Sequence, residues 1–123
     1  VPIAYGLSFP HRIESGASRL DFLSQAALTF EAPDPRRFPG LQLAYDALRG
    51  PEGSSVILNA ANEVAVAAFL DGTIRFTDIH TVNMRTIDAL AGRLGPLTTV
   101  DDLLALDGRA RAAASAQAGA LSR

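Results

Sequence analysis

Large apolar residues alternate with small or polar residues at the start of the chain. They occupy every second position from Ile3 to Phe9, which is the period of a strand with one buried face. Residues 27–31 alternate in the same way and lead into a proline-rich stretch. The pattern predicts two short strands, separated by a loop over residues 11–19 that is rich in turn-forming residues.

Two short strands do not make a stable sheet in water, because an independent sheet needs a third strand or a covering layer. Their unpaired edges would also be exposed. The first residues, Val1-Pro2-Ile3-Ala4, have neither an initiator Met nor the organisation of a signal peptide. We therefore expect this chain to be part of a longer protein, with the missing strands and any targeting segment lying upstream.

The middle of the chain has helical periodicity. From Pro39 to Leu48, apolar residues recur at the spacing of one helix face, and Gly50-Pro51 ends that helix. Residues 54–70 are apolar on nearly every face, which predicts a central, buried helix. Thr77-Asp78 is suited to cap a further helix, whose inner side would carry apolar residues as far as Leu90.

The last third of the chain predicts two more helical segments. Thr99, followed by Asp101 and Asp102, is a favourable helix start, because acidic residues in the first turn complement the helix dipole. Asp107-Gly108 is expected to break this helix. The alanine-rich residues 109–121 then predict a helix with few large apolar contacts and weakly packed ends. The fold class is thus an α+β fragment: one or two strands of a sheet completed by absent upstream sequence, then a bundle of four to five helices.

Composition removes several classes of function. The formal net charge is −2, and the arginines form no cluster that would attract a phosphate backbone, so we expect no nucleic-acid partner. The longest apolar run, Val64 to Leu70, is far too short to span a bilayer. The chain has no cysteine and no lysine, which excludes disulfides, thiolate nucleophiles, a lysine Schiff base and a P-loop.

The most distinctive polar feature is a stripe on the helix over residues 54–70. Asn59, Asn62 and Glu63 lie at i, i+3 and i+4, which places two amides and a carboxylate on one side of an apolar helix. The stripe could bind a polar ligand, or it could form hydrogen bonds with backbone groups of the strand region or the linker. We favour the structural role, because buried polar side chains usually have such partners.

Other candidates for chemistry are weaker. His11 could act with Ser8 or Ser15 in proton transfer, but no pattern fixes a serine and an acid relative to it, so a surface role is favoured. His80 stands alone near a helix start. Arg36-Arg37 could hold a phosphate, but beside two prolines they are better explained as a solvated turn.

A metal site is not indicated either. Asp101-Asp102 could contribute to one, but they are better explained as helix-start charges, and the other acids lack a converging spacing. No glycine-rich dinucleotide fingerprint is present. The sequence alone therefore assigns no catalytic, cofactor-binding or metal-binding residue.

Three segments together resemble one family. They are Leu-Ser-Phe-Pro-His-Arg at 7–12, Leu-Thr-Phe-Glu-Ala-Pro-Asp at 28–34 and Leu-Asn-Ala-Ala-Asn-Glu-Val-Ala-Val-Ala-Ala-Phe-Leu at 58–70. The chain resembles the carboxy-terminal portion of the 1-deoxy-D-xylulose 5-phosphate reductoisomerase family over essentially its whole length. Gly40 is a departure, because this family commonly carries cysteine after Phe-Pro.

The resemblance implies an NADPH-dependent enzyme that makes 2-C-methyl-D-erythritol 4-phosphate for isoprenoid synthesis and requires magnesium or manganese. It implies that residues 1–34 are the end of a central catalytic domain and a linker, and that residues 35–123 are the carboxy-terminal helical domain. The implied partners are the upstream NADPH-binding and catalytic domains in a cytoplasmic homodimer. None of the family's metal, substrate or NADPH motifs falls in this chain, so it implies an inactive segment.

Two alternatives remain open. The chain could be a stand-alone helical interaction or assembly module that holds a partner in an apolar groove. It could also be a small hydrolase that uses His11, although nothing locates an oxyanion hole or an orienting acid. The unpaired strands predicted over residues 3–31 argue against the interaction module.

Overall fold

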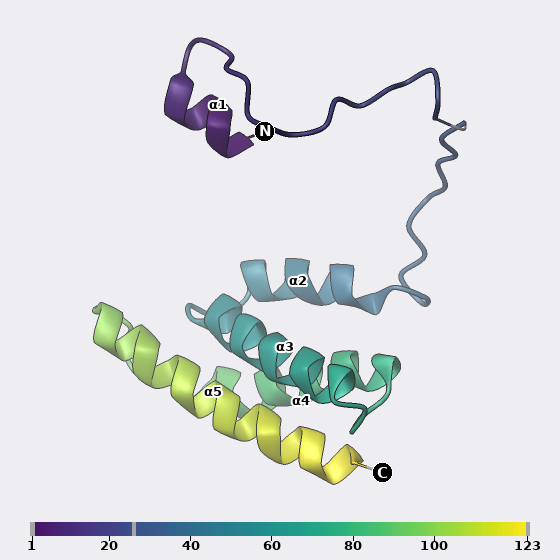
Figure 1. Ribbon diagram of the computed structural model, residues 1–123. Helices are drawn as coiled ribbons and strands as arrows, with labels where there is room; N and C mark the ends of the chain where they lie inside the picture. The colour runs from purple at the N-terminus through teal and green to yellow at the C-terminus, as the bar shows by residue number, and fades with distance from the viewer. Residues whose placement is uncertain (1, 26, 123) are drawn as a thin grey trace. The chain divides into compact units, whose positions relative to one another are not determined.

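The computed structural model describes residues 2–25 and 27–122, and Val1, Ala26 and Arg123 lie outside the described residues. Contacts along the chain divide it into two units, Val1–Ala32 and Pro33–Arg123. Because the two units are not placed relative to each other, each is described by itself (Figure 1).

The first unit contains one short helix, α1 (Pro2–Ser8), followed by turns and irregular backbone. Helix α1 lies where the alternation predicted a strand, and the residues of the second predicted strand, 27–31, are irregular. Within the part of the chain that the structure describes, no strand is present. The two strand predictions, and with them the α+β class, are therefore wrong, and the fold is all-helical.

The reason for this error lies in burial. None of the residues of α1 is buried, and Ile3 and Leu7 are 80% and 84% exposed. An alternating pattern specifies a strand only where a neighbouring strand pairs its backbone and a second layer covers its apolar face. Without either, local hydrogen bonds satisfy the backbone, and the Tyr5 and Phe9 rings meet edge to face at i, i+4 with centroids 5.9 Å apart.

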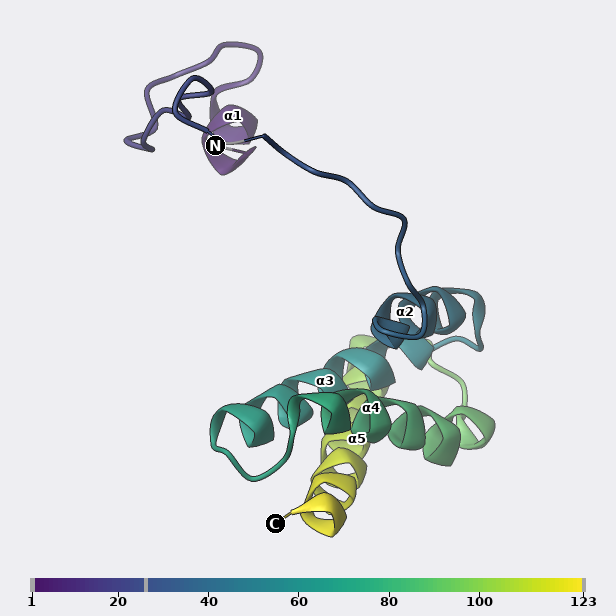
Figure 2. The ribbon, with the colours of Figure 1, turned by 90° about the vertical axis from the view of Figure 1, so that its right-hand side faces the viewer.

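The second unit is a bundle of four helices. They are α2 (Pro39–Arg49), α3 (Ser54–Leu70), α4 (Phe76–Leu90) and α5 (Val100–Leu121), with a short 3₁₀ turn, η1 (Ala91–Arg93), after α4. Helix α3 packs against each of the other three helices (Figure 1). Figure 2 shows α5 crossing the pair formed by α3 and α4. The predicted bundle of four to five helices is confirmed, with α3 as its central member.

Two groups of buried residues form the core, and α3 contributes to both. One group joins Ala61 and Ala65 of α3 to α4 and to the end of α5. The other joins Ile57 and Ala60 of α3 to the first half of α5, where Leu106 is fully buried. The prediction that residues 54–70 form a central helix is confirmed, since this helix contributes to both groups and packs against α2, α4 and α5.

The predicted bounds of α2 and α3 are also confirmed, and α4 begins slightly earlier than predicted. The helix starts at Phe76 after Arg75, whose backbone N–H donates to Asp78 Oδ2 at 2.8 Å. The sequence pattern placed the helix cap at Thr77-Asp78, whereas the cap residue in the structure is Arg75. Asp78 lies inside the first turn, and its carboxylate accepts the hydrogen bond from the Arg75 N–H.

Helix α5 continues without a break through Asp107-Gly108, so the predicted interruption is wrong. A glycine inside a helix costs only about 1 kcal/mol relative to alanine. Burial of Leu106, Ala110, Ala114 and Ala118 along one side of the helix outweighs that cost. The predicted helix over residues 109–121 is confirmed, and its buried residues are alanines, but the expectation of weakly packed ends is wrong, because Ala118 is buried and Leu121 packs against the core.

A glycine sets the entry into α3. Gly53 precedes the helix with φ +88°, a left-handed conformation that side chains rarely adopt. A Cβ atom at this position would lie 2.5 Å from Leu97 Cδ1 and 2.8 Å from Leu106 Cδ2. The backbone at Gly53 thus approaches the side chains of Leu97 and Leu106 so closely that only a hydrogen atom fits there in place of a side chain.

Candidate functional site: a groove between α2, α3 and α4

A concave surface of the second unit lies between α2, α3 and α4 and has a volume of about 830 Å³. Its walls are largely apolar, and they include Phe38, Leu41, Ala44, Leu48, Leu58 and Phe76. Several of these side chains are unusually exposed for their size, with Leu48 at 76% and Phe76 at 70%. We name this surface the α2–α3–α4 groove.

Polar side chains from α3 and α4 line part of this groove. Asn83 Nδ2 on α4 donates to Asn62 Oδ1 on α3 at 3.1 Å. Asn83 is only 6% exposed, and its Oδ1 is buried without a hydrogen-bond partner in the protein. His80, one turn earlier on α4, also lines the groove, and its Nδ1 is likewise buried and unpartnered.

A second, smaller hollow of about 440 Å³ lies between α2, the start of α3 and α4. His80, Leu43 and Ala47 line both concavities. Helix α2 therefore has open space along two of its sides. This fits its position in the bundle, where it packs mainly against α3 and only slightly against α4.

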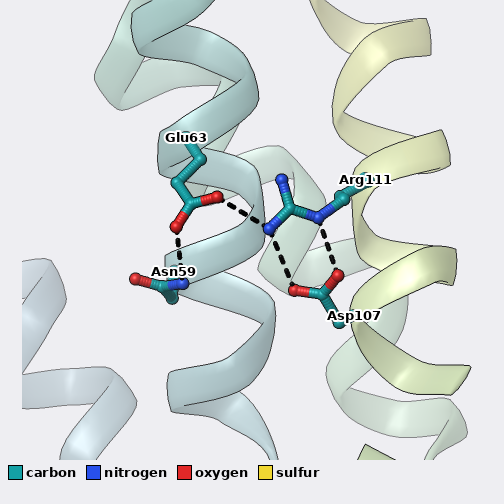
Figure 3. A network of polar contacts seen from close by, with 4 residues as sticks. All are labelled: Asn59, Glu63, Asp107 and Arg111. Atoms are coloured by element: carbon teal, nitrogen blue, oxygen red, sulfur yellow. Dashed lines mark hydrogen bonds and ion pairs between the residues drawn. The ribbon is translucent and has the colours of Figure 1, made fainter. Parts of the chain in front are cut away.

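The side chains of the polar stripe predicted on α3 contact two other helices, α4 and α5. Figure 3 shows the part of this network that joins Asn59 and Glu63 to α5. Glu63 Oε1 accepts from Asn59 Nδ2 at 3.2 Å, and Glu63 Oε2 accepts from Arg111 of α5 at 2.7 Å. Arg111 Nε also donates to Asp107 Oδ2 at 2.7 Å. Asn62, in contrast, is bound to α4 through Asn83. The stripe thus joins α3 to both α4 and α5 through side chains, and not to the backbone of a strand or linker as we had expected.

The charges of this network stabilise one another. Hydrogen bonds from Arg111, and then from Asn59, hold the pKa of the Glu63 carboxyl below its ordinary value. The hydrogen bond to Asp107, followed by that to Glu63, raises the pKa of Arg111. Because these side chains are partly exposed, the network is a surface clamp between helices rather than a buried charged site.

The histidine and serine candidates of the first unit are not assembled into a catalytic set. Ser8 Oγ lies 2.9 Å from the carbonyl oxygen of Ala4 and 2.7 Å from that of His11, which are backbone groups. No hydrogen bond among the described residues joins the His11 ring to Ser8 or Ser15. The geometry gives no support to a hydrolase.

The charged pairs also have structural explanations. The backbone N–H groups of Arg36 and Arg37 donate to Asp34 Oδ1, which forms the turn before α2, while both side chains border the groove. The N–H groups of Thr98 and Thr99 donate to Asp102 Oδ2 at 3.0 and 2.9 Å. The helix start predicted at Thr99 is confirmed.

Over residues 2–25 and 27–122, no group of three or more histidine, aspartate or glutamate side chains is placed to hold a metal ion. No helix in the same ranges has both the length and the apolar character needed to cross a membrane. What the second unit offers is a shaped, mostly apolar groove with two unpartnered polar atoms.

Fold and groove together define an all-helical domain of the bundle class. The family follows from comparison with known proteins. A family model described as the DXP reductoisomerase C-terminal domain matches residues 1–113, and the chain belongs to this family.

The individual relatives that the chain matches are reductoisomerases of this family. The chain is 50% identical over 121 residues to the 1-deoxy-D-xylulose 5-phosphate reductoisomerase of Cupriavidus metallidurans, which covers 98% of this chain and 30% of that protein. It is 51% identical over 113 residues to that of Rhodopseudomonas palustris strain HaA2, covering 90% of this chain and 28% of the relative. The chain therefore spans less than a third of the length of these relatives.

Solved structures of reductoisomerases have a similar fold over the part that matches this chain. The Zymomonas mobilis reductoisomerase in complex with NADPH is 39% identical, with a TM-score of 0.80, and the match covers 95% of this chain and 30% of that one. A DOX-P reductoisomerase in complex with magnesium is 35% identical, with a TM-score of 0.83, and covers 99% of this chain and 32% of the other.

The sequence reasoning missed the polar part of the groove. It treated His80 as an isolated residue and did not consider Asn83 at all. A signal was available, because the two residues are three positions apart on the side of α4 that faces α3. Such an i, i+3 polar pair on an inner helix face resembles the stripe that the same reasoning did select on α3.

Proposed function

We propose that this chain acts as the carboxy-terminal part of an enzyme that converts 1-deoxy-D-xylulose 5-phosphate to 2-C-methyl-D-erythritol 4-phosphate with NADPH, in isoprenoid biosynthesis. The observation that carries the proposal is 50% identity to the Cupriavidus reductoisomerase over 98% of this chain. Identity at this level over both units is not explained by a shared helical fold alone.

The catalytic groups belong, on this proposal, to the rest of the enzyme. Solved relatives are described as complexes with NADPH and with magnesium, and we propose NADPH with magnesium or manganese as the cofactors of the complete protein. The described residues of this chain do not fit either group, since they hold no set of metal ligands and the sequence has no dinucleotide fingerprint. We assign no catalytic, cofactor-binding or metal-binding residue to it.

The first unit supports an assignment to a larger assembly. Its large apolar side chains lie in solvent, including Leu23 at 98% and Phe30 at 91% exposure, and α1 has no buried residue. A segment of this composition needs a surface to cover it. We propose that residues 1–34 are the end of the catalytic domain and the linker, that residues 35–123 are the helical domain, and that the complete enzyme is a cytoplasmic homodimer.

The test is an NADPH oxidation assay with 1-deoxy-D-xylulose 5-phosphate and magnesium on three samples: the complete polypeptide, the polypeptide lacking this chain, and this chain alone. Consumption of NADPH by the complete polypeptide, and none by this chain alone, is the expected result. Turnover by this chain alone would overturn the assignment of the active site. A complete polypeptide that is folded but inactive would favour the interaction-module alternative.

A further inference from the structure

Helix α2 lies outside the core of the bundle. The two groups of buried residues that form the core come from α3, α4, α5 and the segments that follow α3 and α4, and no residue of α2 belongs to either group. Ala47 is the only buried residue of α2. The packing of α3, α4 and α5 on one another is therefore complete without α2.

The polar contacts between helices also leave α2 out. Asn83 of α4 donates to Asn62 of α3, and Arg111 of α5 donates to Glu63 of α3. Among the described residues, no hydrogen bond or ion pair joins α2 to another helix, and the side-chain hydrogen bond of Gln42 stays within α2. Apolar contact alone holds α2 on the bundle.

This apolar contact is bordered by open space. Hollows of about 830 Å³ and about 440 Å³ lie along two sides of α2. Leu43 and Ala47, one turn apart on the side of α2 that faces the bundle, line both hollows. Because dispersion attraction needs atoms in direct contact, a helix with space on two sides is held more weakly than one that is closely packed all round.

The turn after α2 has one residue suited to act as a hinge. Gly53 is enclosed by two leucine side chains and is fixed against the core. The ring of Pro51 locks its φ, and its carbonyl oxygen accepts hydrogen bonds from the N–H and the hydroxyl of Ser54. Gly50, which directly follows α2 with φ −74° and ψ −174°, has no side chain to restrict its backbone rotation.

We propose that α2 is a hinged lid, which separates from the α3–α5 core about Gly50 while the core stays folded. Opening the lid joins the two hollows into one exposed surface of α3 and α4. The proposal does not depend on the proposed function of the enzyme, because every contact that carries it lies within residues 33–123.

Opening should also unfold α2 itself. The helix has 11 residues, and isolated helices shorter than about 12–15 residues are only marginally stable in water. The backbone N–H groups of α2 therefore become free to exchange with solvent in the open state, while those of α3, α4 and α5 stay protected. Hydrogen exchange thus distinguishes the opening of the lid from unfolding of the whole bundle.

Hydrogen–deuterium exchange of the complete polypeptide, followed by mass spectrometry of peptides from each helix, is the test. The comparison uses residues 43–49 of α2 and 58–70 of α3, because the first four N–H groups of a helix have no partner within it. We expect protection factors in α2 that are lower than those in α3 by at least about tenfold, yet clearly above those of an unfolded chain.

Two variants of α2 test which contact holds the lid closed. Leu43→Ala removes the largest side chain of α2 that lines both hollows. Leu48→Ala makes the same substitution on the same helix at a position that is 76% exposed, so both variants change the intrinsic helix propensity equally. We expect Leu43→Ala to speed exchange in α2 by about tenfold and Leu48→Ala to change it by no more than about twofold, with exchange in α3, α4 and α5 unaltered in both.

Three results would overturn the proposal. Exchange in α2 as slow as that in α3 would mean that the lid does not open separately. Exchange in α2 at the rate of an unfolded chain would mean that no closed lid exists. Faster exchange throughout the bundle in Leu43→Ala would make α2 part of one cooperative unit with α3, α4 and α5.

Discussion

Gly53 is the position where a single methyl group should do most harm to the bundle. It combines a φ of +88° with side chains that crowd the space where a Cβ would lie. Gly53→Ala therefore meets two separate penalties, one from the left-handed backbone and one from overlap with Leu97 and Leu106. Leu106 is fully buried and has little freedom to move away.

The magnitudes follow from these two causes. A residue with a side chain in the left-handed region costs about 1–2 kcal/mol, and inserting a methyl group into a packed core costs about 1–3 kcal/mol. We expect Gly53→Ala to lower the free energy of unfolding by about 2–5 kcal/mol, a large part of the roughly 5–15 kcal/mol typical of a domain.

Two other glycines provide matched controls. Gly72 has φ +74° with nothing within 4 Å of a Cβ, so Gly72→Ala carries the backbone penalty alone. Gly108 lies inside α5 with open space around it, so Gly108→Ala should stabilise the helix by about 0.5–1 kcal/mol.

Thermal unfolding followed by circular dichroism ranks the three variants. In a domain of this size, about 1 kcal/mol shifts the Tm by roughly 4–8 °C, so the order should be Gly108→Ala, wild type, Gly72→Ala, Gly53→Ala from most to least stable. If Gly53→Ala loses no more than Gly72→Ala, the close packing of this turn against Leu97 and Leu106 is not real.

Three further predictions concern the core, a helix cap and acid stability. Leu106→Ala should cost about 2–5 kcal/mol in chemical denaturation, because it empties a fully buried position, and a loss below about 1 kcal/mol would contradict that burial. Thr99→Ala should cost about 1 kcal/mol by removing the acceptor for the N–H of Asp102, measured in the same way. Hydrogen bonds from Thr99 and then Thr98 hold the pKa of Asp102 below its ordinary value. The stabilisation is therefore present above the unfolded-state pKa and is lost as the pH falls through the folded-state pKa. A Tm–pH profile in the acid range should be flatter for Asp102→Asn than for the wild type.

Helix positions could be predicted from the sequence where the ends carry unambiguous signals. The end of α3 follows from Asp71-Gly72, which comes directly after an apolar run. The start of α5 follows from Thr99 and Asp102, whose reciprocal hydrogen bonds form over only four residues. In both cases the information is local, so tertiary structure is not needed to interpret it.

The errors arose where the decisive contact is distant in sequence. The alternation over residues 3–9 has the period of a strand, but it does not show whether a neighbouring strand and a covering layer are there to hold one. Gly108 looks like a helix end until the packing of α5 on α3 is known. The charged partner of Glu63 is Arg111, 48 positions away, and no spacing rule in a single sequence connects two such residues.

The alanines that join α5 to α3 fix how these helices align. Ala110, Ala114 and Ala118 recur every four residues and are buried against a face of α3 that is itself rich in alanine. If α5 slipped by one residue along this seam, Arg109 or Arg111 would enter a space that accommodates only a methyl group. The low sequence variety of this segment therefore does not leave the alignment of α5 on α3 undefined. The small size of its side chains, rather than their hydrophobicity, permits one alignment of the two helices and rejects the neighbouring ones.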